Sequence, residues 1–271
     1  MYSSYGSQGS AAIQNQQMMN AYLKDKQNWS TIGYKPDNVQ FQDYYNQAYS
    51  GGMGARNMST SIVFTQGQIV ESPNKNPLDL AIEGNGLFSL SDGKKMVYTR
   101  DGQLSWEPST GTLVHKSTGM KVMGKMLDAN QNPTGELCEF KTDGANSYRF
   151  DETGKLYKTE IIQDSKGTGQ TQTREVPVFQ VSIASFLNPS GLKRFGNNAF
   201  VPSNNSGKPV QGFSGMGSSF GIVHPSSVEL SSFDISQNSQ QLVKAQQEHD
   251  ANINALKLMD KMTQNAMNLI K

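Results

Sequence analysis

Residues 226–271 read SSVELSSFDISQNSQQLVKAQQEHDANINALKLMDKMTQNAMNLIK and contain neither glycine nor proline. Asp234 followed by Gln237 resembles a capping box, which marks the start of a helix. From there, heptad spacing puts seven apolar side chains on one seam, typical of a helix that packs on another helix: Ile235, Leu242, Ala245, Leu256, Met259, Ala266 and Ile270. Polar residues interrupt the same seam at Asn238, His249, Asn252 and Thr263. We therefore predict a C-terminal helix, about 50 Å long, that needs neighbours because its apolar face is too poor to be stable alone in water.

A second helix is predicted near the N-terminus, since neither glycine nor proline occurs between Gly9 and Gly33. Ser10 is a suitable cap, and the helix is expected to run from about Ser10 to Trp29. Its stripe has alternating spacings of four and three residues and comprises Ala12, Gln16, Met19, Leu23 and Lys26, with Ile13 beside it. So narrow a stripe suits a partner helix better than a globular core.

The chain between the helices is rich in glycine, asparagine, serine and threonine, with short alternating apolar runs. Turn signals about every 8–12 residues indicate an antiparallel all-β part. Residues 78–82 and 87–90 are predicted to be a pair of strands around Gly84-Asn85-Gly86. Asp92-Gly93 and Asp101-Gly102 are predicted to be turns.

The predicted fold class is therefore α+β, with long terminal helices paired as a coiled-coil-like layer and an antiparallel β body between them. Residues 1–35 and 225–271 are expected to form one discontinuous helical domain that serves polymerisation. Residues 36–60 are expected to be a linker region and residues 61–224 the β domain, with 125–175 as its most exposed portion.

Composition excludes several classes of function. The formal net charge is +1 and the basic residues are scattered, which gives no reason to expect nucleic acid or an anionic membrane as a partner. Cys138 is the single cysteine, so an internal disulfide and a thiol-rich metal site are ruled out, and we expect a small buried or half-buried residue there. The N-terminus lacks the features of a cleaved signal peptide, and no window approaches the ~20 apolar residues of a membrane helix.

Catalytic and ligand-binding interpretations find little support in the residue pattern. His115, His224 and His249 are far apart and lack the spacing of metal ligands, so structural roles are expected for them. Gly84 and Gly86 lack the G-x-x-x-x-G-K pattern of a phosphate loop, and nothing local indicates a Ser-His-Asp triad. We predict that the chain is not an enzyme and binds no cofactor and no metal.

Several segments resemble, in order, the signatures of the bacterial flagellar rod and hook proteins. The first is NPLDLAIEGNGLF at 76–88, preceded by FTQG at 64–67 and followed by YTRDG at 98–102. FLNPSGL at 186–192, GNNAF at 196–200 and QQEHDAN at 246–252 resemble further family segments. The residues of the β motif are Leu78, Asp79, Leu80, Ala81, Ile82, Gly84, Gly86, Phe88, Tyr98, Thr99, Arg100, Asp101 and Gly102. The family's Asn-Asn-Leu-Ala-Asn box is replaced at 24–32, where Asn28 and the following Gly33-Tyr34-Lys35 remain.

The resemblance implies a structural subunit of the flagellar basal-body rod that assembles helically into a tube, transmits torque and encloses the export channel. It implies export without a cleaved signal by the flagellar export apparatus, to a place outside the cytoplasmic membrane in the periplasmic space or cell envelope. Implied partners are copies of the chain and other rod and hook proteins, with no membrane insertion. The residues expected to carry assembly are Ile13, Met19, Leu23, Ile235, Leu242, Ala245, Asn252, Leu256, Met259 and Ile270.

Three alternatives remain open from the sequence. The first alternative, within the same family, is a proximal rod or short hook subunit. In a different class, the chain is a secreted β-rich hydrolase or carbohydrate-binding module, which requires a cleft with converging acidic or nucleophilic groups. The interrupted seams of the two helices also fit a simple intramolecular hairpin.

Overall fold

The computed structural model describes residues 2–43, 56–128, 130–143, 147–163, 171–196, 198–217 and 219–269. The chain divides into two units. The helix unit contains residues 1–29, 36–63 and 233–271, and the β body contains residues 30–35 and 64–232. The predicted α+β class, with a helix at each end and a mostly antiparallel β part, is confirmed. This division departs from the expected boundaries, because residues 30–35 belong to the β body and residues 36–63 to the helix unit.

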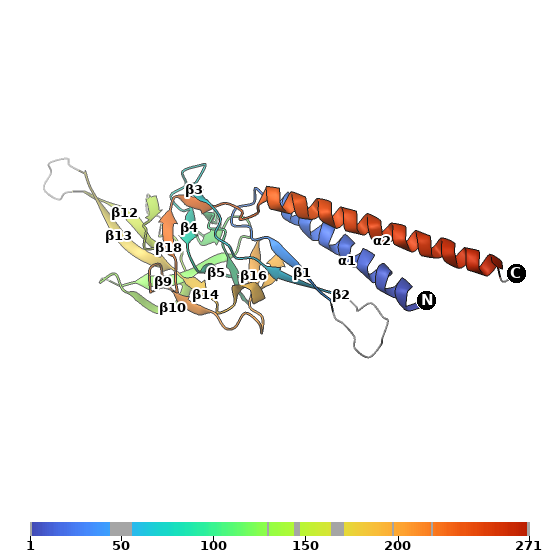
Figure 1. The fold of residues 1–271 in the computed structure, drawn as a ribbon. Coiled ribbons are helices and arrows are strands. Elements are labelled where there is room, and N and C mark those ends of the chain that lie inside the picture. The colour runs from blue at the N-terminus through green and yellow to red at the C-terminus, as the bar shows by residue number, and fades with distance from the viewer. Residues whose placement is uncertain are drawn as a thin grey trace. The chain divides into compact units, whose positions relative to one another are not determined.

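Two long helices make up most of the helix unit, and they lie side by side in antiparallel directions (Figure 1). They are α1 (Tyr2–Gln27) and α2 (Ile235–Leu269). α1 begins well before the predicted Ser10, since the glycines of its first turns do not stop it. Asp234 caps α2 as predicted, because its Oδ1 accepts hydrogen bonds from the backbone N–H groups of Ser236 (2.8 Å) and Gln237 (3.1 Å).

Two paired strands lie near the start and the end of residues 36–60, the segment predicted to be a linker. They are β1 (Asp37–Asp43) and β2 (Arg56–Ile62), paired antiparallel from Asp37 opposite Ile62 to Asp43 opposite Arg56. The carboxylate of Asp25 in α1 accepts a hydrogen bond from the backbone N–H of Asp37 at 3.0 Å, which fixes the start of β1. The linker interpretation is therefore wrong for both strands. Tyr44, Tyr45, Tyr49 and the SGGMG run at 50–54 lie outside the described residues.

The β body is built from short strands, and every strand pair found in the described residues is antiparallel. A 13-stranded sheet has the main order β11-β12-β13-β9-β5-β6-β16-β15, with β7, β8, β10, β14 and β17 attached to it. Two smaller sheets pair β3 with β19 and β4 with β18. The strands are β3 (Ile69–Glu71), β4 (Leu80–Glu83), β5 (Leu87–Ser91), β6 (Met96–Thr99), β7 (Leu104–Trp106), β8 (Leu113–His115), β9 (Lys121–Leu127), β10 (Pro133–Glu139), β11 (Ser147–Phe150), β12 (Lys155–Gln163), β13 (Thr171–Val181), β14 (Ile183–Ser185), β15 (Lys193–Gly196), β16 (Ala199–Val201), β17 (Val210–Gly212), β18 (Ile222–Pro225) and β19 (Ser227–Glu229).

The strands on either side of Gly84-Asn85-Gly86 exist as predicted, but they do not form a pair with each other. β4 pairs with β18, whereas β5 pairs with β6, β9 and β14. The glycines therefore carry the chain from one sheet to another instead of closing a hairpin. Gly86 has a φ of +128°, and a Cβ there would lie 2.3 Å from the side chain of Ile183, so both conformation and space favour glycine.

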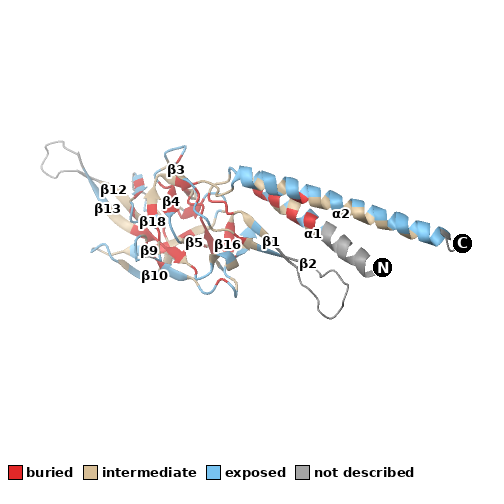
Figure 2. Ribbon diagram, viewed as in Figure 1, coloured by how far each residue is buried: buried red, intermediate tan, exposed pale blue. Residues whose placement is uncertain are grey.

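One apolar core holds the β body together, and Figure 2 shows its buried residues gathered at the centre of the strands. Phe88 and Leu90 of β5 and Phe179 of β13 are among the fully buried side chains. Phe140, Tyr148, Phe150 and Leu156 also belong to this core. These four lie within 125–175, so the portion predicted to be the most exposed part of the body also contributes side chains to its core.

Candidate assembly surface and buried charge cluster

The contact between α1 and α2 is centred on Met18, Tyr22 and Ala245, which are all buried. Met19, Leu242 and Val39 of β1 pack around them. The two helices therefore pack on each other within one chain, as the hairpin alternative allows. Burial against this contact raises the pKa of the Tyr22 hydroxyl, and the nearby Asp25 and Glu248 carboxylates raise it further.

The buried face of α1 is displaced by one residue from the predicted stripe. It consists of Asn15, Met18, Tyr22 and Asp25, at spacings of three, four and three residues. Gln16, Leu23 and Lys26 are exposed, Met19 is half-buried, and the side chain of Ala12 is not described. The prediction of the packing face is therefore wrong for α1, because hydrophobicity alone could not indicate that Asp25 is held inside by the backbone of Asp37.

The heptad seam predicted for α2 is visible in its burial. Figure 2 shows that most of α2 is exposed and that its covered positions recur along one side. The buried or half-buried seam positions are Asn238, Leu242, Ala245, His249, Asn252, Leu256, Met259 and Thr263. The two ends of the predicted seam are not covered, since Ile235 is 47% exposed and Ala266 is also exposed. Ile270 lies outside the described residues.

Large apolar side chains remain uncovered on both helices. On and just after α1 they are Ile13, Leu23 and Trp29, and on α2 they are Ile235, Val243, Leu258, Met262 and Met267. Ile13 is 63% exposed and Met262 is 64% exposed. Burying such side chains is worth about 1.5–3 kcal/mol each, so these faces favour association with other apolar surfaces.

A buried charge cluster lies in the β body around Glu229, the last residue of β19. Its side chain is fully buried. Oε1 accepts hydrogen bonds from Lys35 Nζ at 2.6 Å and from the backbone N–H of Gly67 at 2.7 Å. Oε2 accepts a hydrogen bond from Arg100 Nε at 2.7 Å. One carboxylate thus pairs with two buried basic side chains, and the pairing offsets part of their lost hydration.

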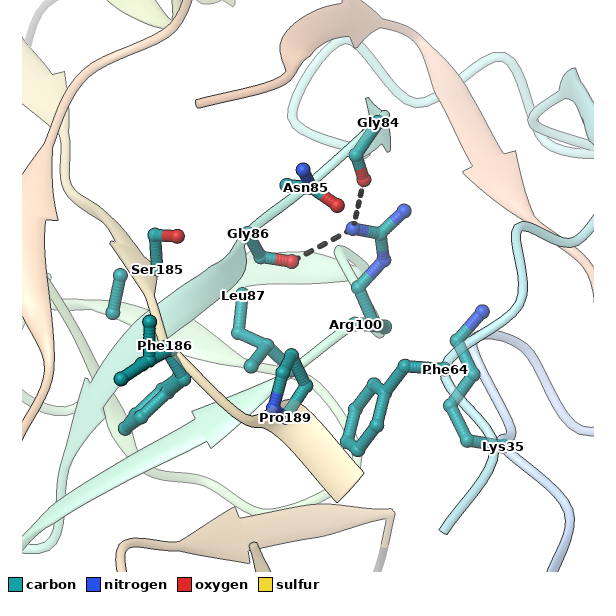
Figure 3. Close-up of a pocket in the computed structure, with 12 residues that line it drawn as sticks. Lys35, Phe64, Gly84, Asn85, Gly86, Leu87, Arg100, Ser185, Phe186 and Pro189 are labelled. Atoms are coloured by element: carbon teal, nitrogen blue, oxygen red, sulfur yellow. Dashed lines mark hydrogen bonds between the residues drawn. The ribbon is translucent and has the colours of Figure 1, made fainter. Parts of the chain in front are cut away.

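Arg100, at the end of β6, uses all of its remaining donors within the same cluster. Its Nη1 donates to the carbonyl oxygens of Gly84 (2.8 Å) and Gly86 (2.7 Å), as Figure 3 shows. Its Nη2 donates to the carbonyl of Ile82 at 2.7 Å and to the Oε1 atom of Gln66 at 2.9 Å. Since a guanidinium has five N–H groups, Arg100 is saturated. It ties the crossing between β4 and β5 to β19.

The same cluster fastens together the two segments through which the chain enters and leaves the β body. The backbone N–H of Gly33 donates to the carbonyl of Glu229 at 2.6 Å, and that of Ser232 donates to the carbonyl of Tyr34 at 3.3 Å. Lys35 Nζ also donates to the carbonyl of Thr65 at 2.6 Å. Residues 33–35 are therefore buried in the body and held there by both backbone and side-chain bonds.

The buried ammonium group of Lys35 gives the stability of the body a pH dependence. Burial lowers its pKa below the ordinary value of 10.5, and Glu229 partly opposes this effect. Between the folded and unfolded pKa values the unfolded chain holds more protons, so stability rises with pH in that window. Lys35→Met should cost about 1–3 kcal/mol at about pH 7, and its deficit relative to wild type should grow toward about pH 9.5. Urea unfolding at both pH values measures the difference in free energy of unfolding between wild type and Lys35→Met. The exposed Lys116→Met is the control. A difference that shrinks toward the higher pH would contradict the role of the buried ammonium group.

A cavity of about 240 Å³ adjoins the cluster (Figure 3). Its described lining contains no histidine and no carboxylate, and its arginine is saturated. The lining residues are Lys35, Phe64, Gly84, Asn85, Gly86, Leu87, Arg100, Ala184, Ser185, Phe186, Leu187 and Pro189. This cavity therefore lacks the converging acidic or activated nucleophilic groups that the hydrolase alternative requires.

Asp101, His115 and Ser117 lie close together, which the sequence did not indicate. His115 Nε2 is 3.2 Å from Asp101 Oδ2, and its Nδ1 is 2.8 Å from Thr118 Oγ1. Ser117 Oγ is 3.4 Å from both ring nitrogens and so is directed at neither. A triad needs one nitrogen turned to the nucleophile and the other to the carboxylate, whereas here Ser117 Oγ also lies 3.4 Å from Asp101 Oδ2, so the three side chains are not in that arrangement.

The described residues contain no group of three or more histidine, cysteine, aspartate or glutamate side chains arranged to hold a metal ion. None of their helices is long and apolar enough to cross a membrane.

Most residues of the predicted β motif lie in the interior of the body, whereas Gly84 is exposed and Gly86 is half-buried. Leu78, Leu80, Ala81, Ile82, Phe88 and Tyr98 are buried. Asp79 accepts hydrogen bonds from Ser72 Oγ at 2.5 Å and Asn76 Nδ2 at 2.8 Å, and Thr99 Oγ1 donates to the carbonyl of Asn198 at 2.9 Å. Arg100 is the motif residue whose side chain carries charge in the cluster, and Ile82, Gly84 and Gly86 contribute carbonyl oxygens to it. Most residues of the motif therefore contribute to the packing and hydrogen bonding of the β body.

Sequence reasoning missed three members of the charge cluster, which are Lys35, Gln66 and Glu229. Lys35 and Gln66 stand in segments that resemble the family, namely Gly33-Tyr34-Lys35 and the FTQG run at 64–67, and Glu229 stands in the SSVEL run with which residues 226–271 begin. The presence of all three segments in one chain was the signal that could have indicated the cluster. Lys35 and Glu229 are 194 positions apart, so no local pattern could have paired them.

Known proteins similar to the chain carry a consistent set of names. No family model matches the chain. It is 27% identical over 256 residues to the flagellar basal-body rod protein FlgG of Bacillus subtilis. The aligned part covers 89% of this chain and 89% of that protein. It is 25% identical over 261 residues to FlgG of Borreliella burgdorferi, again over 89% of each. The flagellar hook protein FlgE of the latter is 32% identical over 135 residues, which are 44% of this chain and 30% of the hook protein. With the ordered signatures and the α+β fold, these matches show that the chain is similar to the flagellar rod and hook proteins.

Proposed function

We propose that the chain is a structural subunit of the flagellar basal-body rod and assembles with copies of itself into a tube. The observation that carries this proposal is the match to rod proteins along 89% of both chains, together with a helix unit that leaves large apolar side chains uncovered. The charge cluster supports a mechanical role, since saturated buried bonds hold the connecting segments firmly in the β body. A non-enzymatic role agrees with the cavity described above.

In this proposal, α1 and α2 form a coiled-coil-like layer that lines the tube. The seam of α2 has the heptad spacing of such a layer. The exposed Ile13, Leu23 and Ile235, with the other uncovered side chains of the two helices, contact neighbouring copies. Met19, Leu242, Ala245, Asn252, Leu256 and Met259 hold the pair together within one copy, and Ile270 extends it.

Export by the flagellar apparatus without a cleaved signal, and a final place outside the cytoplasmic membrane, are part of the same proposal. Other rod and hook proteins are the expected neighbours. A proximal rod or short hook subunit is the second candidate, because the hook match has the higher identity but covers only 30% of the hook protein. Locating the chain along an isolated basal body by labelling distinguishes the two.

Assembly should depend on the uncovered side chains of α2. The double substitution Leu258→Ser with Met262→Ser should raise the concentration needed for assembly about tenfold or more, because about 1.4 kcal/mol of lost apolar contact corresponds to a factor of ten. Sedimentation and electron microscopy of the full chain measure this effect.

The matched control is Gln247→Ser with Asn254→Ser, two exposed polar positions of the same helix, which should assemble like wild type. A chain that stays monomeric at high concentration and is absent from isolated basal bodies would refute the proposed function. Equal assembly of the apolar and polar double variants would refute the role of this face.

A further inference from the structure

Asn85 and Gly86 form the only asparagine-glycine pair in the sequence. Asn85 is exposed and belongs to the lining of the cavity beside the charge cluster (Figure 3). Asparagine is among the chemically labile residues of proteins, and the glycine after it has no Cβ that would shield the backbone nitrogen between them. The pair therefore combines an accessible carboxamide, an unshielded nitrogen and contact with solvent.

The reaction open to such a pair is deamidation through a cyclic imide, and its only co-reactant is water. The backbone nitrogen of Gly86 attacks Cγ of the Asn85 carboxamide, forms a new C–N bond and gives up its proton. The C–N bond of the carboxamide breaks, and its nitrogen takes up that proton and leaves as ammonia. Water then adds to one of the two ring carbonyl carbons and opens the ring. The product is either an aspartate or an isoaspartyl link, in which the main chain runs through the former side chain.

The fold itself requires glycine at position 86. Gly86 has a φ of +128°, and a Cβ there would lie 2.3 Å from the side chain of Ile183. A larger residue after Asn85, which would hinder the attacking nitrogen, is thus excluded by the packing of the β body. Protection against the reaction has to come from contacts that hold the backbone in place.

Hydrogen bonds hold this stretch of backbone on both sides of the reacting peptide group. The carbonyl of Asn85 accepts a bond from the backbone N–H of Gly221 at 2.7 Å. The carbonyls of Gly84 and Gly86 both accept from Nη1 of Arg100, at 2.8 Å and 2.7 Å (Figure 3). Ring closure draws the Gly86 nitrogen toward the side chain, so the peptide group has to turn and these bonds are lost. Because Arg100 is buried, its donors would then lack partners, which is costly.

We propose that Asn85 is a deamidation site that the buried charge cluster keeps closed in the folded chain. The reaction then proceeds only through the small fraction of molecules in which this stretch has opened. An isoaspartyl link would add a carbon to the main chain between the carbonyls of Gly84 and Gly86, so Arg100 could no longer bind both in the same way. A chain that opens and reacts therefore cannot rebuild the cluster. This proposal goes beyond the proposed function and does not rest on it.

Mass spectrometry of the full chain during incubation at neutral pH tests the site. Fragmentation of the tryptic peptide 76–94 locates the mass gain at Asn85. We expect the chain unfolded in guanidinium chloride to deamidate there at least about tenfold faster than the folded chain. In the unfolded chain Asn254, which precedes an alanine, should react more slowly than Asn85. A folded chain that reacts as fast as the unfolded one, or an Asn254 that reacts as fast as Asn85, would overturn the proposal.

Arg100→Lys tests the role of the cluster, because lysine keeps the positive charge near Glu229 but lacks the planar fork that binds two carbonyls at once. Deamidation of the folded variant should be about tenfold faster than in wild type or more. Low concentrations of guanidinium chloride should change its rate little, since local opening exposes little surface. The control is Leu156→Val, which shortens a buried core side chain outside the cluster and should react like wild type.

Resistance to protease shows whether Arg100→Lys is folded. If it is not, Gln66→Ala takes its place, because Gln66 Oε1 accepts the backbone N–H of Gly84 at 3.0 Å and one donor of Arg100. This milder variant should react severalfold faster than Leu156→Val. A folded cluster variant that reacts no faster than Leu156→Val, or one whose rate rises with denaturant as steeply as global unfolding, would overturn the protective role of the cluster.

Discussion

Gly102→Ala is expected to unfold the β body or to lower its stability by about 4 kcal/mol or more. A Cβ atom at this position would lie 1.7 Å from the carbonyl oxygen of Leu80 and 2.8 Å from the ring of Phe88. Both neighbours are fully buried, and the carbonyl of Gly102 accepts a hydrogen bond from the backbone N–H of Leu80 at 3.0 Å. Because the obstacle is backbone in a packed core, the strands would have to separate. Urea unfolding and resistance to protease measure the effect.

Gly93→Ala is the matched control, because Gly93 also follows an aspartate in a predicted turn. It has a φ of +80°, and a Cβ there would meet nothing within 4 Å. Only the left-handed backbone conformation then opposes alanine, at a cost of about 1–2 kcal/mol. Equal unfolding midpoints for the two variants would contradict the close approach at Gly102.

Glu229→Gln is expected to lower the stability of the β body by about 3–5 kcal/mol, which is the usual cost of removing one partner from a buried ion pair. The substitution keeps the size of the side chain but leaves Lys35 and Arg100 as two buried cations without a counter-charge. The loss should exceed that of Lys35→Met, because the carboxylate without Lys35 still accepts hydrogen bonds from Arg100 and from the backbone of Gly67. Urea unfolding of the full chain, followed by tryptophan fluorescence, gives the comparison.

Glu71→Gln serves as the control for this substitution. Glu71 lies in β3, which pairs with β19, but its side chain is exposed. Neutralising it should change stability by no more than about 0.5 kcal/mol. If Glu229→Gln were tolerated as well as Glu71→Gln, the two cations would not depend on the buried carboxylate.

The strands and the C-terminal helix could be predicted from the sequence because their signals are local. Alternation and turn residues predict β5, β6, β7 and β8, and heptad spacing predicts α2 from its cap at Asp234. The packing face of α1 could not be predicted by hydrophobicity, since Asn15 and Asp25 are inside while Ile13 and Leu23 are outside. Polar contacts made by other segments override the hydrophobic pattern there.

Long-range pairing was the other part that the sequence could not supply. The two strands beside Gly84 and Gly86 look like a hairpin with each other, but β4 finds its partner far along the chain in β18. β5 pairs with the next strand, β6, and with the more distant β9 and β14. The partners of Glu229 lie at 35, 67 and 100. Such contacts depend on the topology of the whole body, which single-sequence periodicity does not encode.

The bonds that join Gly33 to Glu229 and Tyr34 to Ser232 bring the beginning and the end of the β body together. A piece of chain whose ends are neighbours behaves as a cassette, since residues can be added to it or removed from it without drawing its two anchor points apart. Residues 30–232 should therefore be excisable as a self-standing fragment and should tolerate closure into a circle by a short added linker.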